Sequence, residues 1–216
     1  MTDFYVQYGC GDNTPHGWLN FDSSPTLRLQ RIPVMGEMIA RLTGVKFPEQ
    51  ARYGDIVAGL PVSPGSVRGL YASHVLEHLS LEAARQALRN SFEILESGGT
   101  FRLIVPDLLE RARNYIRASE RGDATAAHQF VASTYLGREQ EPKGAIGPLR
   151  AVIGNSGHLW MWDYDAMSFE LEKAGFVSIR AARFGDAIDP MFYRVEDPDR
   201  FVDDGITEVA IEARRP

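Results

Sequence analysis

The stretch VRGLYASHVLEHLSLEAARQAL, residues 67–88, decides the fold of this chain. Residues 67–73 have the apolar and aromatic content of a buried strand. Ser80 can cap a helix that runs to about Leu95, with Glu82 in its first turn. The apolar residues that share one face of this helix are Leu81, Ala84, Leu88, Phe92 and Leu95. A strand followed by an amphipathic helix is one half of the unit that builds parallel sheets.

The same alternation of strands and helices continues along the chain. The predicted strands span residues 4–8, 18–21, 51–57 (a weaker one), 100–105, 176–182 and 206–213. A helix is expected at residues 36–43, and another from Asp163 or Asp165 to Lys173, stopped by Gly175. Gly98 and Gly99 are expected to stop the helix that Ser80 begins. The last strand alternates as an edge strand does, so we expect an α/β fold with one mostly parallel sheet.

The composition of the chain argues against several classes of function. The 216 residues, 44% of them hydrophobic, are enough for one domain with a real core. A formal net charge of −6 argues against a nucleic-acid partner. The single cysteine, Cys10, excludes an internal disulfide framework and a multi-cysteine zinc site. No leader-like segment and no membrane-spanning run is visible, so a cytoplasmic protein without a membrane span is expected.

The motif His74-x-x-Glu77-His78 has the spacing of one class of zinc peptidase. That chemistry needs both histidines on one helix, with Glu77 activating a water. His74 directly follows a predicted strand, however, and the signal for the helix start, Ser80, comes after His78. The motif is therefore placed in the loop at the carboxyl end of a strand, where parallel sheets bind ligands. Zinc binding, and histidines satisfied only by nearby backbone, stay open as alternatives.

Two further polar features fall at the same edge of the sheet. Gly9 and Gly11 follow the first strand and let a ligand approach the backbone closely, and Asp22 ends the second strand. A carboxylate there can accept hydrogen bonds from the two hydroxyls of a ribose, or it can cap the turn that follows. A third glycine and a helix start are missing, which disfavours a nicotinamide dinucleotide. S-adenosylmethionine has a ribose and no phosphate, so it does not need that cradle.

At this point the sequence resembles the class I S-adenosylmethionine-dependent methyltransferases, in particular small members often associated with glycan biosynthesis. The similar segments, in chain order, are VQYGCGDN, WLNFDSSP, GDIVAGLPVSPGSVRGLYASHVLEHL, LRNSFEILESGGTFRLIVPD and LEKAGFVSIR. The resemblance implies a Rossmann-like sheet of order 3-2-1-4-5-7-6 with helices on both faces and the last strand antiparallel. It implies a single methyltransferase-like domain over residues 1–216, with a cap inserted at about 107–157.

The resemblance also implies roles for individual residues. The residues expected to bind S-adenosylmethionine are Gly9 and Gly11 under its methionine end, Asp22 at the ribose, Asp55 near the adenine, and Ser73 and His74 closing over it. Glu77 and His78 resemble a pair that faces the substrate in some members of the family.

One feature departs from the family's pattern. Only residues 12–17 separate Gly11 from Trp18, whereas a parallel crossover normally needs a dozen residues or more. The first crossover helix is therefore expected to be shortened or absent. Either the helix at 36–43 takes its place or the cofactor pocket is more open, and a binding or partner protein with a degraded cofactor site stays an alternative.

Substrate signals lie between Pro106 and Tyr164. The aromatic residues Trp160, Trp162 and Tyr164 are expected to wall a small-molecule pocket, although tryptophans that only pack under a loop are the alternative. For a hydroxyl acceptor we expect His78 or His158 as the general base, Glu77 as its orienting group and His74 as a third choice. The arginines expected to form a solvated helix face are Arg111, Arg113, Arg117 and Arg121.

Three classes of function therefore stay open. The favoured one is methyl transfer from S-adenosylmethionine to a small acceptor, such as a sugar or glycan precursor hydroxyl or amine, with no metal. The second is the partner protein. The third is a zinc hydrolase through His74, Glu77 and His78.

Overall fold

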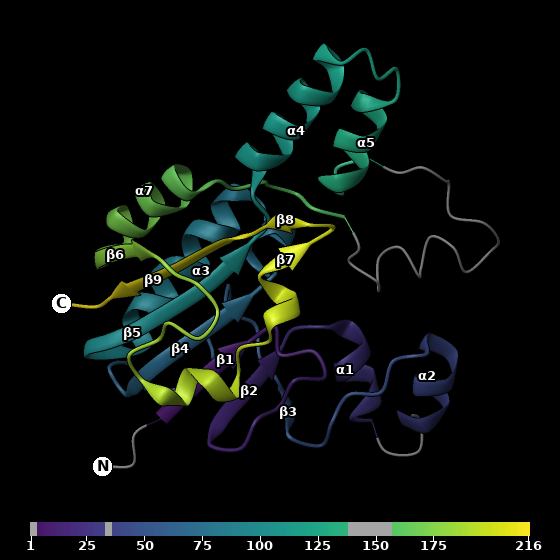
Figure 1. Cartoon of the computed structure of the whole chain (residues 1–216). Helices are drawn as coiled ribbons and strands as arrows, with labels where there is room; N and C mark the ends of the chain where they lie inside the picture. The colour runs from purple at the N-terminus through teal and green to yellow at the C-terminus, as the bar shows by residue number, and fades with distance from the viewer. Residues whose placement is uncertain (1–3, 33–35, 138–156) are drawn as a thin grey trace.

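The computed structural model describes residues 4–32, 36–137 and 157–216 and shows a mixed α/β fold around one seven-stranded sheet (Figure 1). The sheet has the order β3-β2-β1-β4-β5-β9-β6. Its strands, in chain order, are β1 Phe4–Tyr8, β2 Trp18–Asp22, β3 Ala51–Tyr53, β4 Val67–Ser73, β5 Leu95–Val105, β6 Val177–Ala181 and β9 Val209–Arg214. The first five strands run parallel, and β9 is antiparallel to both β5 and β6. The predicted order 3-2-1-4-5-7-6 is confirmed, since β9 is the seventh strand of this sheet.

Two helices, α3 (Leu81–Ile94) and α7 (Tyr164–Ala174), cover one face of the sheet. Their predicted caps are confirmed. The Ser80 hydroxyl accepts from the Ala83 amide, the Asp163 carboxylate accepts from the Ala166 amide, and Gly175 ends α7 in the left-handed conformation at φ 103°. Both helices therefore begin where their capping side chains replace the missing intrahelical partners.

Two boundary predictions are wrong. Helix α3 ends at Ile94, before Gly98 and Gly99, which lie inside β5. The last strand, β9, is an interior strand, since it pairs with β5 on one side and with β6 on the other. Its residues 209–213 are all buried, so the alternation of residue types reflects two different buried environments rather than one wet face. The tail of the predicted strand, Ile206–Thr207, forms β8 in a separate hairpin with β7, Val202–Asp203.

The first crossover contains no helix, as the spacing predicted. Residues 9–17 join β1 to β2 directly, although the two strands are parallel. Helices α1 (Pro25–Gln30) and α2 (Gly36–Thr43) follow β2 instead, and α1 packs beside the edge strand β3. Leu27 of α1 is buried against Cys10 and Ala51, so α1 covers the β3 end of the sheet, and α2 packs against α1.

A segment from the other end of the chain covers the sheet face opposite α3 and α7. Residues 182–201, here called the covering segment, contain two short 3-10 helices, η2 (Pro190–Arg194) and η3 (Pro198–Arg200), and cross in front of the central strands in Figure 1. Phe192 and Val195 are fully buried there, against a cluster that includes Trp18 of β2. The covering segment therefore supplies the apolar layer for this face in place of a first crossover helix.

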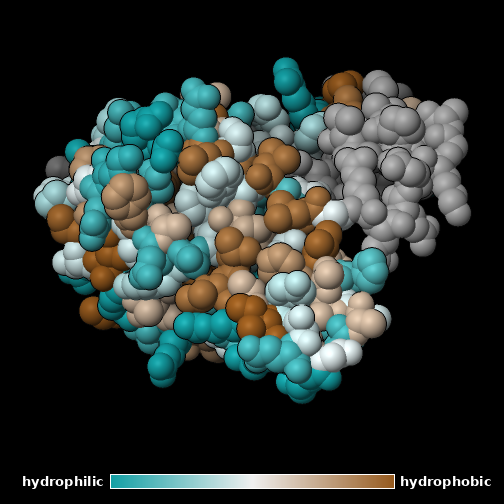
Figure 2. Space-filling view, turned by 90° about the horizontal axis from the view of Figure 1, so that it is seen from above, coloured by the Kyte–Doolittle hydropathy of each residue, from teal (hydrophilic) through white to brown (hydrophobic). Residues whose placement is uncertain are grey.

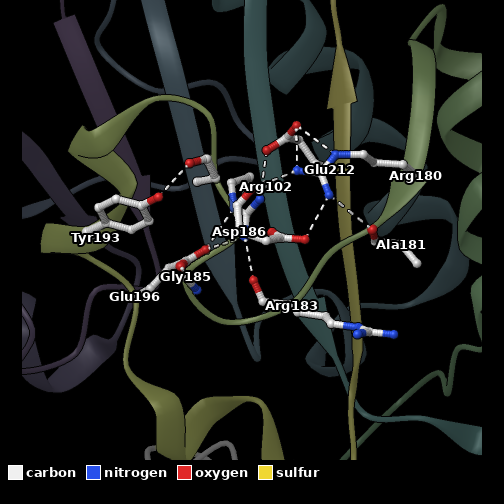
Figure 3. Close-up of polar contacts among 10 residues, drawn as sticks. Arg102, Arg180, Ala181, Arg183, Gly185, Asp186, Tyr193, Glu196 and Glu212 are labelled. Carbon is white, nitrogen blue, oxygen red and sulfur yellow. Dashed lines mark hydrogen bonds and ion pairs between the residues drawn. The ribbon is translucent and has the colours of Figure 1, made fainter.

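Buried charges hold the covering segment to the sheet (Figure 3). Arg102 of β5 is 1% exposed, and its guanidinium donates to Glu196 at 2.7 Å, to Glu212 of β9 at 2.7 Å and to Asp186 at 3.0 Å. Arg180 of β6 adds bonds to Glu212 and Asp186. Burial raises the pKa of Glu196, while Arg102 opposes that shift. Since each buried charge has a partner, the cost of desolvating them is offset by this network.

Helices α4 (Leu108–Glu120) and α5 (Ala126–Ser133) rise from the carboxyl end of β5 (Figure 1). The prediction of a wholly solvated arginine face is wrong for Arg111, which is 1% exposed and binds both oxygens of Glu208, at 2.9 and 2.7 Å. Glu208 lies between β8 and β9, and Arg111 also donates to Asp203 of β7 at 3.2 Å, so these contacts tie α4 to the β7–β8 hairpin. The cap predicted for about 107–157 includes these helices, and its residues 138–156 lie outside the described ranges. Within those ranges, no helix combines the length and apolar character needed to cross a bilayer.

Candidate functional site

Four polar side chains meet beside a small cavity at the carboxyl end of the parallel strands. His74, Glu77 and His78 come from the loop between β4 and α3, which contains the 3-10 turn η1 (Leu76–His78), and His158 comes from the chain before α7. The cavity has a volume of about 220 Å³. The predicted position in a loop after a strand is confirmed, because β4 ends at Ser73 and α3 begins at Leu81. The peptidase arrangement, with His74 inside a helix, is not formed.

Glu77 lies at the centre of this group and is completely buried. Its Oε1 is 3.4 Å from His74 Nδ1 and 3.9 Å from His78 Nε2. Among the described residues, neither carboxylate oxygen has a partner in hydrogen-bond geometry. A buried carboxylate without a donor is costly, so its presence calls for a compensating ligand or a catalytic role.

The backbone holds Glu77 and His158 together. The Glu77 carbonyl accepts from the amides of Leu159 at 2.7 Å and Trp160 at 3.1 Å, and the His158 amide donates to the Tyr135 carbonyl at 3.1 Å. The rings of His78 and His158 lie 5.0 Å apart in an edge-on arrangement. These bonds bring together residues that are far apart in the sequence, as predicted for a shared catalytic pocket, whereas their catalytic roles stay predictions.

The contacts of the two loop histidines indicate which ring nitrogen carries a proton. His78 Nδ1 lies 3.2 Å from the Gly157 carbonyl oxygen, and His74 Nε2 lies 2.9 Å from the Arg200 carbonyl oxygen. A carbonyl only accepts, so these nitrogens donate, and the other nitrogen of each ring faces Glu77. His74 also has φ 53°, a left-handed conformation that is uncommon outside glycine.

The pKa values of two histidines move in opposite directions. Burial alone would lower the pKa of His74, but the Glu77 carboxylate and the Arg200 carbonyl outweigh it, so the pKa is raised. Burial lowers the pKa of His158, against the opposing field of Glu77. The lowered pKa favours the neutral form of His158, and a neutral imidazole can accept a proton, as a general base must.

Two of the residues predicted to bind a cofactor, Gly11 and Asp22, form a second group at the same edge. Asp22, the last residue of β2, accepts from the Gly11 amide at 3.0 Å and from the Ser24 amide at 2.7 Å. Gly11 has φ 54°, and no atom lies within 4 Å of the place that a Cβ would take. The ribose and turn-capping alternatives for Asp22 are thus compatible, because each carboxylate oxygen has a second lone pair to offer a ligand.

Gly9 has a packing role in this structure. At φ 69°, a Cβ on Gly9 would overlap with Cγ2 of Val75, which stands between His74 and Leu76. Val75 therefore packs against this side of Gly9, and the predicted contact of the Gly9 backbone with the methionine end of a cofactor stays a prediction. Through the same contact, the loop that carries His74 and His78 packs against the loop that carries Gly11.

Asp55 and Ser73 give less support to the predicted pocket. Asp55 caps its own turn, where Oδ1 accepts from the Val57 amide at 2.8 Å. The Ser73 hydroxyl oxygen is buried at the end of β4. None of the hydrogen bonds of His74 described above involves Gly9, Gly11 or Asp22. The cofactor contacts expected for Asp55, Ser73 and His74 stay predictions.

The three aromatic residues that were predicted to line a substrate pocket differ in solvent exposure. Trp162 is 1% exposed and belongs to the main core, which favours the packing alternative for it. Trp160 and Tyr164 are 42% and 36% exposed and remain available. The face seen from above carries apolar side chains gathered between polar ones (Figure 2).

Four residues from inserted segments line the cavity and were not predicted as site residues from the sequence: Tyr135, Asp199, Arg200 and Asp203. Tyr135 follows α5, Asp199 and Arg200 belong to η3 in the covering segment, and Asp203 belongs to β7. They come from segments inserted between the sheet strands. No local motif marks such positions, because only the folded backbone brings these insertions to the sheet edge.

The geometry agrees with a known fold. A solved S-adenosylmethionine-dependent methyltransferase from Thermotoga maritima, described as a possible histamine N-methyltransferase, is similar over 99% of this chain and 82% of its own, with a TM-score of 0.50 and 15% identity. An S-adenosylmethionine-dependent methyltransferase from Archaeoglobus fulgidus covers 99% of this chain and 86% of its own, with a TM-score of 0.47 and 12% identity. No family profile matches the sequence, and no curated protein matches it. The chain has the fold of the class I S-adenosylmethionine-dependent methyltransferases, as the sequence resemblance predicted.

Proposed function

We propose that this protein transfers a methyl group from S-adenosylmethionine to a small-molecule acceptor. The observation that carries the proposal is the pair of Gly11 and Asp22 at the carboxyl ends of β1 and β2. There a part-buried carboxylate is held by the Gly11 amide at 3.0 Å beside open space. On a sheet of this strand order, that is the edge where a nucleoside binds, and the residues fit the ribose side of such a ligand.

The bound cofactor would supply a methyl group on a positively charged sulfur, so the chain has mainly to position the acceptor and exclude water. Asp22 would accept hydrogen bonds from the ribose hydroxyls in addition to its two amide donors. The contact between Val75 and Gly9 supports one continuous site, because it brings the Glu77 loop against the cofactor loop.

The cavity beside Glu77 is the proposed acceptor site. A hydroxyl acceptor must lose its proton during transfer, and His158, whose pKa is lowered by burial, or His78 would take it. Glu77 would orient these rings, and Tyr135, which lines the cavity, would contact the acceptor. Sugars and glycan precursors with a free hydroxyl or amine are the first acceptors to screen.

Calorimetric titration with S-adenosylmethionine, and separately with its demethylated product, tests the proposal. We expect micromolar binding by the wild-type chain. Asp22→Asn should weaken it on the order of tenfold or more, because a charge-assisted bond is lost. Asp165→Asn, which makes the same change of charge at an exposed position in the first turn of α7, serves as the matched control and should bind normally.

Two results would contradict the proposal. One is no binding of either compound by the wild-type chain, which would favour the alternative of a fold that has lost its cofactor site. The other is undiminished binding by Asp22→Asn. The unfolding transition of each variant must be measured alongside, since Asp22 also holds two backbone amides.

A further inference from the structure

Glu77, His78 and His158 each offer a ligand atom to one point in space. These atoms all lie within 4.8 Å of one another, and Glu77 Oε1 and His78 Nε2 are already 3.9 Å apart. Zinc bonds of about 2.1 Å in tetrahedral geometry separate neighbouring ligand atoms by roughly 3.4 Å. We propose that these three side chains bind a divalent transition-metal cation of the zinc type, with one coordination position open to the cavity.

The burial of Glu77 is independent support for a cation. The side chain is completely buried, and among the described residues neither oxygen has a hydrogen-bond donor. An ionised carboxylate in such a place needs a compensating charge. His74 approaches only Oε1, at 3.4 Å and outside hydrogen-bond geometry, which leaves the side of the carboxylate that faces His78 and His158 for a cation. A divalent cation between Glu77 and the two rings would compensate the charge of the carboxylate and would be bound by both histidines.

The His78 ring is already oriented for ligation, and the segment that carries His158 is held beside Glu77. The Gly157 carbonyl oxygen, 3.2 Å from His78 Nδ1, holds the tautomer in which Nε2 keeps its lone pair and faces Glu77. The two amide bonds to the Glu77 carbonyl fix the segment that carries His158 beside it. Such outer contacts are typical of metal-binding histidines, whose second ring nitrogen donates to a carbonyl or carboxylate.

This ligand set differs from the zinc-peptidase motif in the sequence. His74 is outside the group, since its Nε2 is committed to the Arg200 carbonyl, and His158 takes the third place. Two imidazoles and one carboxylate with an open position bind zinc or iron in enzymes that activate a bound oxygen. If the proposed function holds, the cation would bind the acceptor's oxygen and lower its pKa, and the proton would pass to solvent through the open side of the cavity. His78 and His158 would then act as metal ligands and not as the general base. Metal binding itself does not depend on the proposed function.

Metal titration of the full-length chain tests the site. The protein is stripped with a chelator and titrated with Zn²⁺ by calorimetry, and with Co²⁺ by visible absorption, which reports tetrahedral ligation. We expect one equivalent to bind with micromolar or tighter affinity. His78→Ala and His158→Ala should each weaken binding at least tenfold, and the exposed His128→Ala on α5 is the matched control that should leave it unchanged.

Two outcomes would overturn the proposal. The first is no stoichiometric binding by the wild-type chain. The second is binding that is lost in His74→Ala but kept in His158→Ala, which would return the site to the sequence motif. Glu77→Gln keeps the side-chain shape, so a properly folded Glu77→Gln protein that still binds Zn²⁺ with wild-type affinity also argues against it. Titrating S-adenosylmethionine with and without chelator separates a failure here from a failure of the proposed function.

Discussion

Replacing Gly9 by alanine tests the contact that joins the two loops of the proposed site. A left-handed alanine costs roughly 1–2 kcal/mol, and Gly9 has φ 69°. The new Cβ would also overlap with Cγ2 of Val75, whose branched side chain has little rotamer freedom. Overpacking of this kind costs about 1–3 kcal/mol, so the free energy of unfolding should fall by about 2–5 kcal/mol in total.

Gly11 provides the matched control. It has φ 54° and nothing within 4 Å of a Cβ, so Gly11→Ala should show only the backbone cost of about 1–2 kcal/mol. Urea unfolding of both variants, of Val75→Ala and of the Gly9→Ala, Val75→Ala double variant separates the two causes. With Val75 shortened, Gly9→Ala should cost about as much as Gly11→Ala. The reasoning is refuted if Gly9→Ala costs no more than Gly11→Ala in the wild-type background, or if the coupling energy lies within about 0.5 kcal/mol of zero.

Three other changes test the fold and the pocket. Arg102→Met should lower the free energy of unfolding by about 3–5 kcal/mol in urea, because it leaves Glu196 buried without its guanidinium partner, and a loss below about 1 kcal/mol would contradict the network. Ser80→Ala should cost about 1 kcal/mol through loss of the α3 cap; thermal unfolding checks it, and no change would mean that the cap contributes nothing. Because the pKa of His74 is raised, this residue stabilises the fold below its unfolded pKa of about 6.5, and the stabilisation is lost as the pH rises through the folded pKa. His74→Gln should therefore flatten the pH dependence of the free energy of unfolding, measured in urea, over this range. Identical profiles for wild type and variant would disprove the interaction with Glu77.

Much of the sheet and its helices could be predicted from the sequence. The strands at 4–8 and 67–73 have the predicted bounds, and the caps Ser80, Asp163 and Gly175 act where expected. These signals are local, because a cap or a strand's apolar run is decided by residues within a few positions of one another. The missing first crossover helix was equally predictable, since a count of residues between two strands limits what can fit.

Predictions that depended on distant partners failed more often. Trp162 was expected at a pocket wall and is in the core, and Arg111 was expected in water and is paired with Glu208 under a hairpin. An aromatic residue or an arginine has the same local pattern in either setting. Whether it is buried depends on which segment packs over it, and here those segments are insertions with little regular structure.

The candidate site divides in the same way. The sequence by itself determined that His74, Glu77 and His78 follow a buried strand and that Asp22 ends another, because strand ends are set by short-range patterns. Only the tertiary structure decided that His158 joins Glu77 and His78 while His74 turns to Arg200. The physical reason is that the deciding bonds, from the Leu159 and Trp160 amides to the Glu77 carbonyl, form between segments that meet only after the sheet has folded.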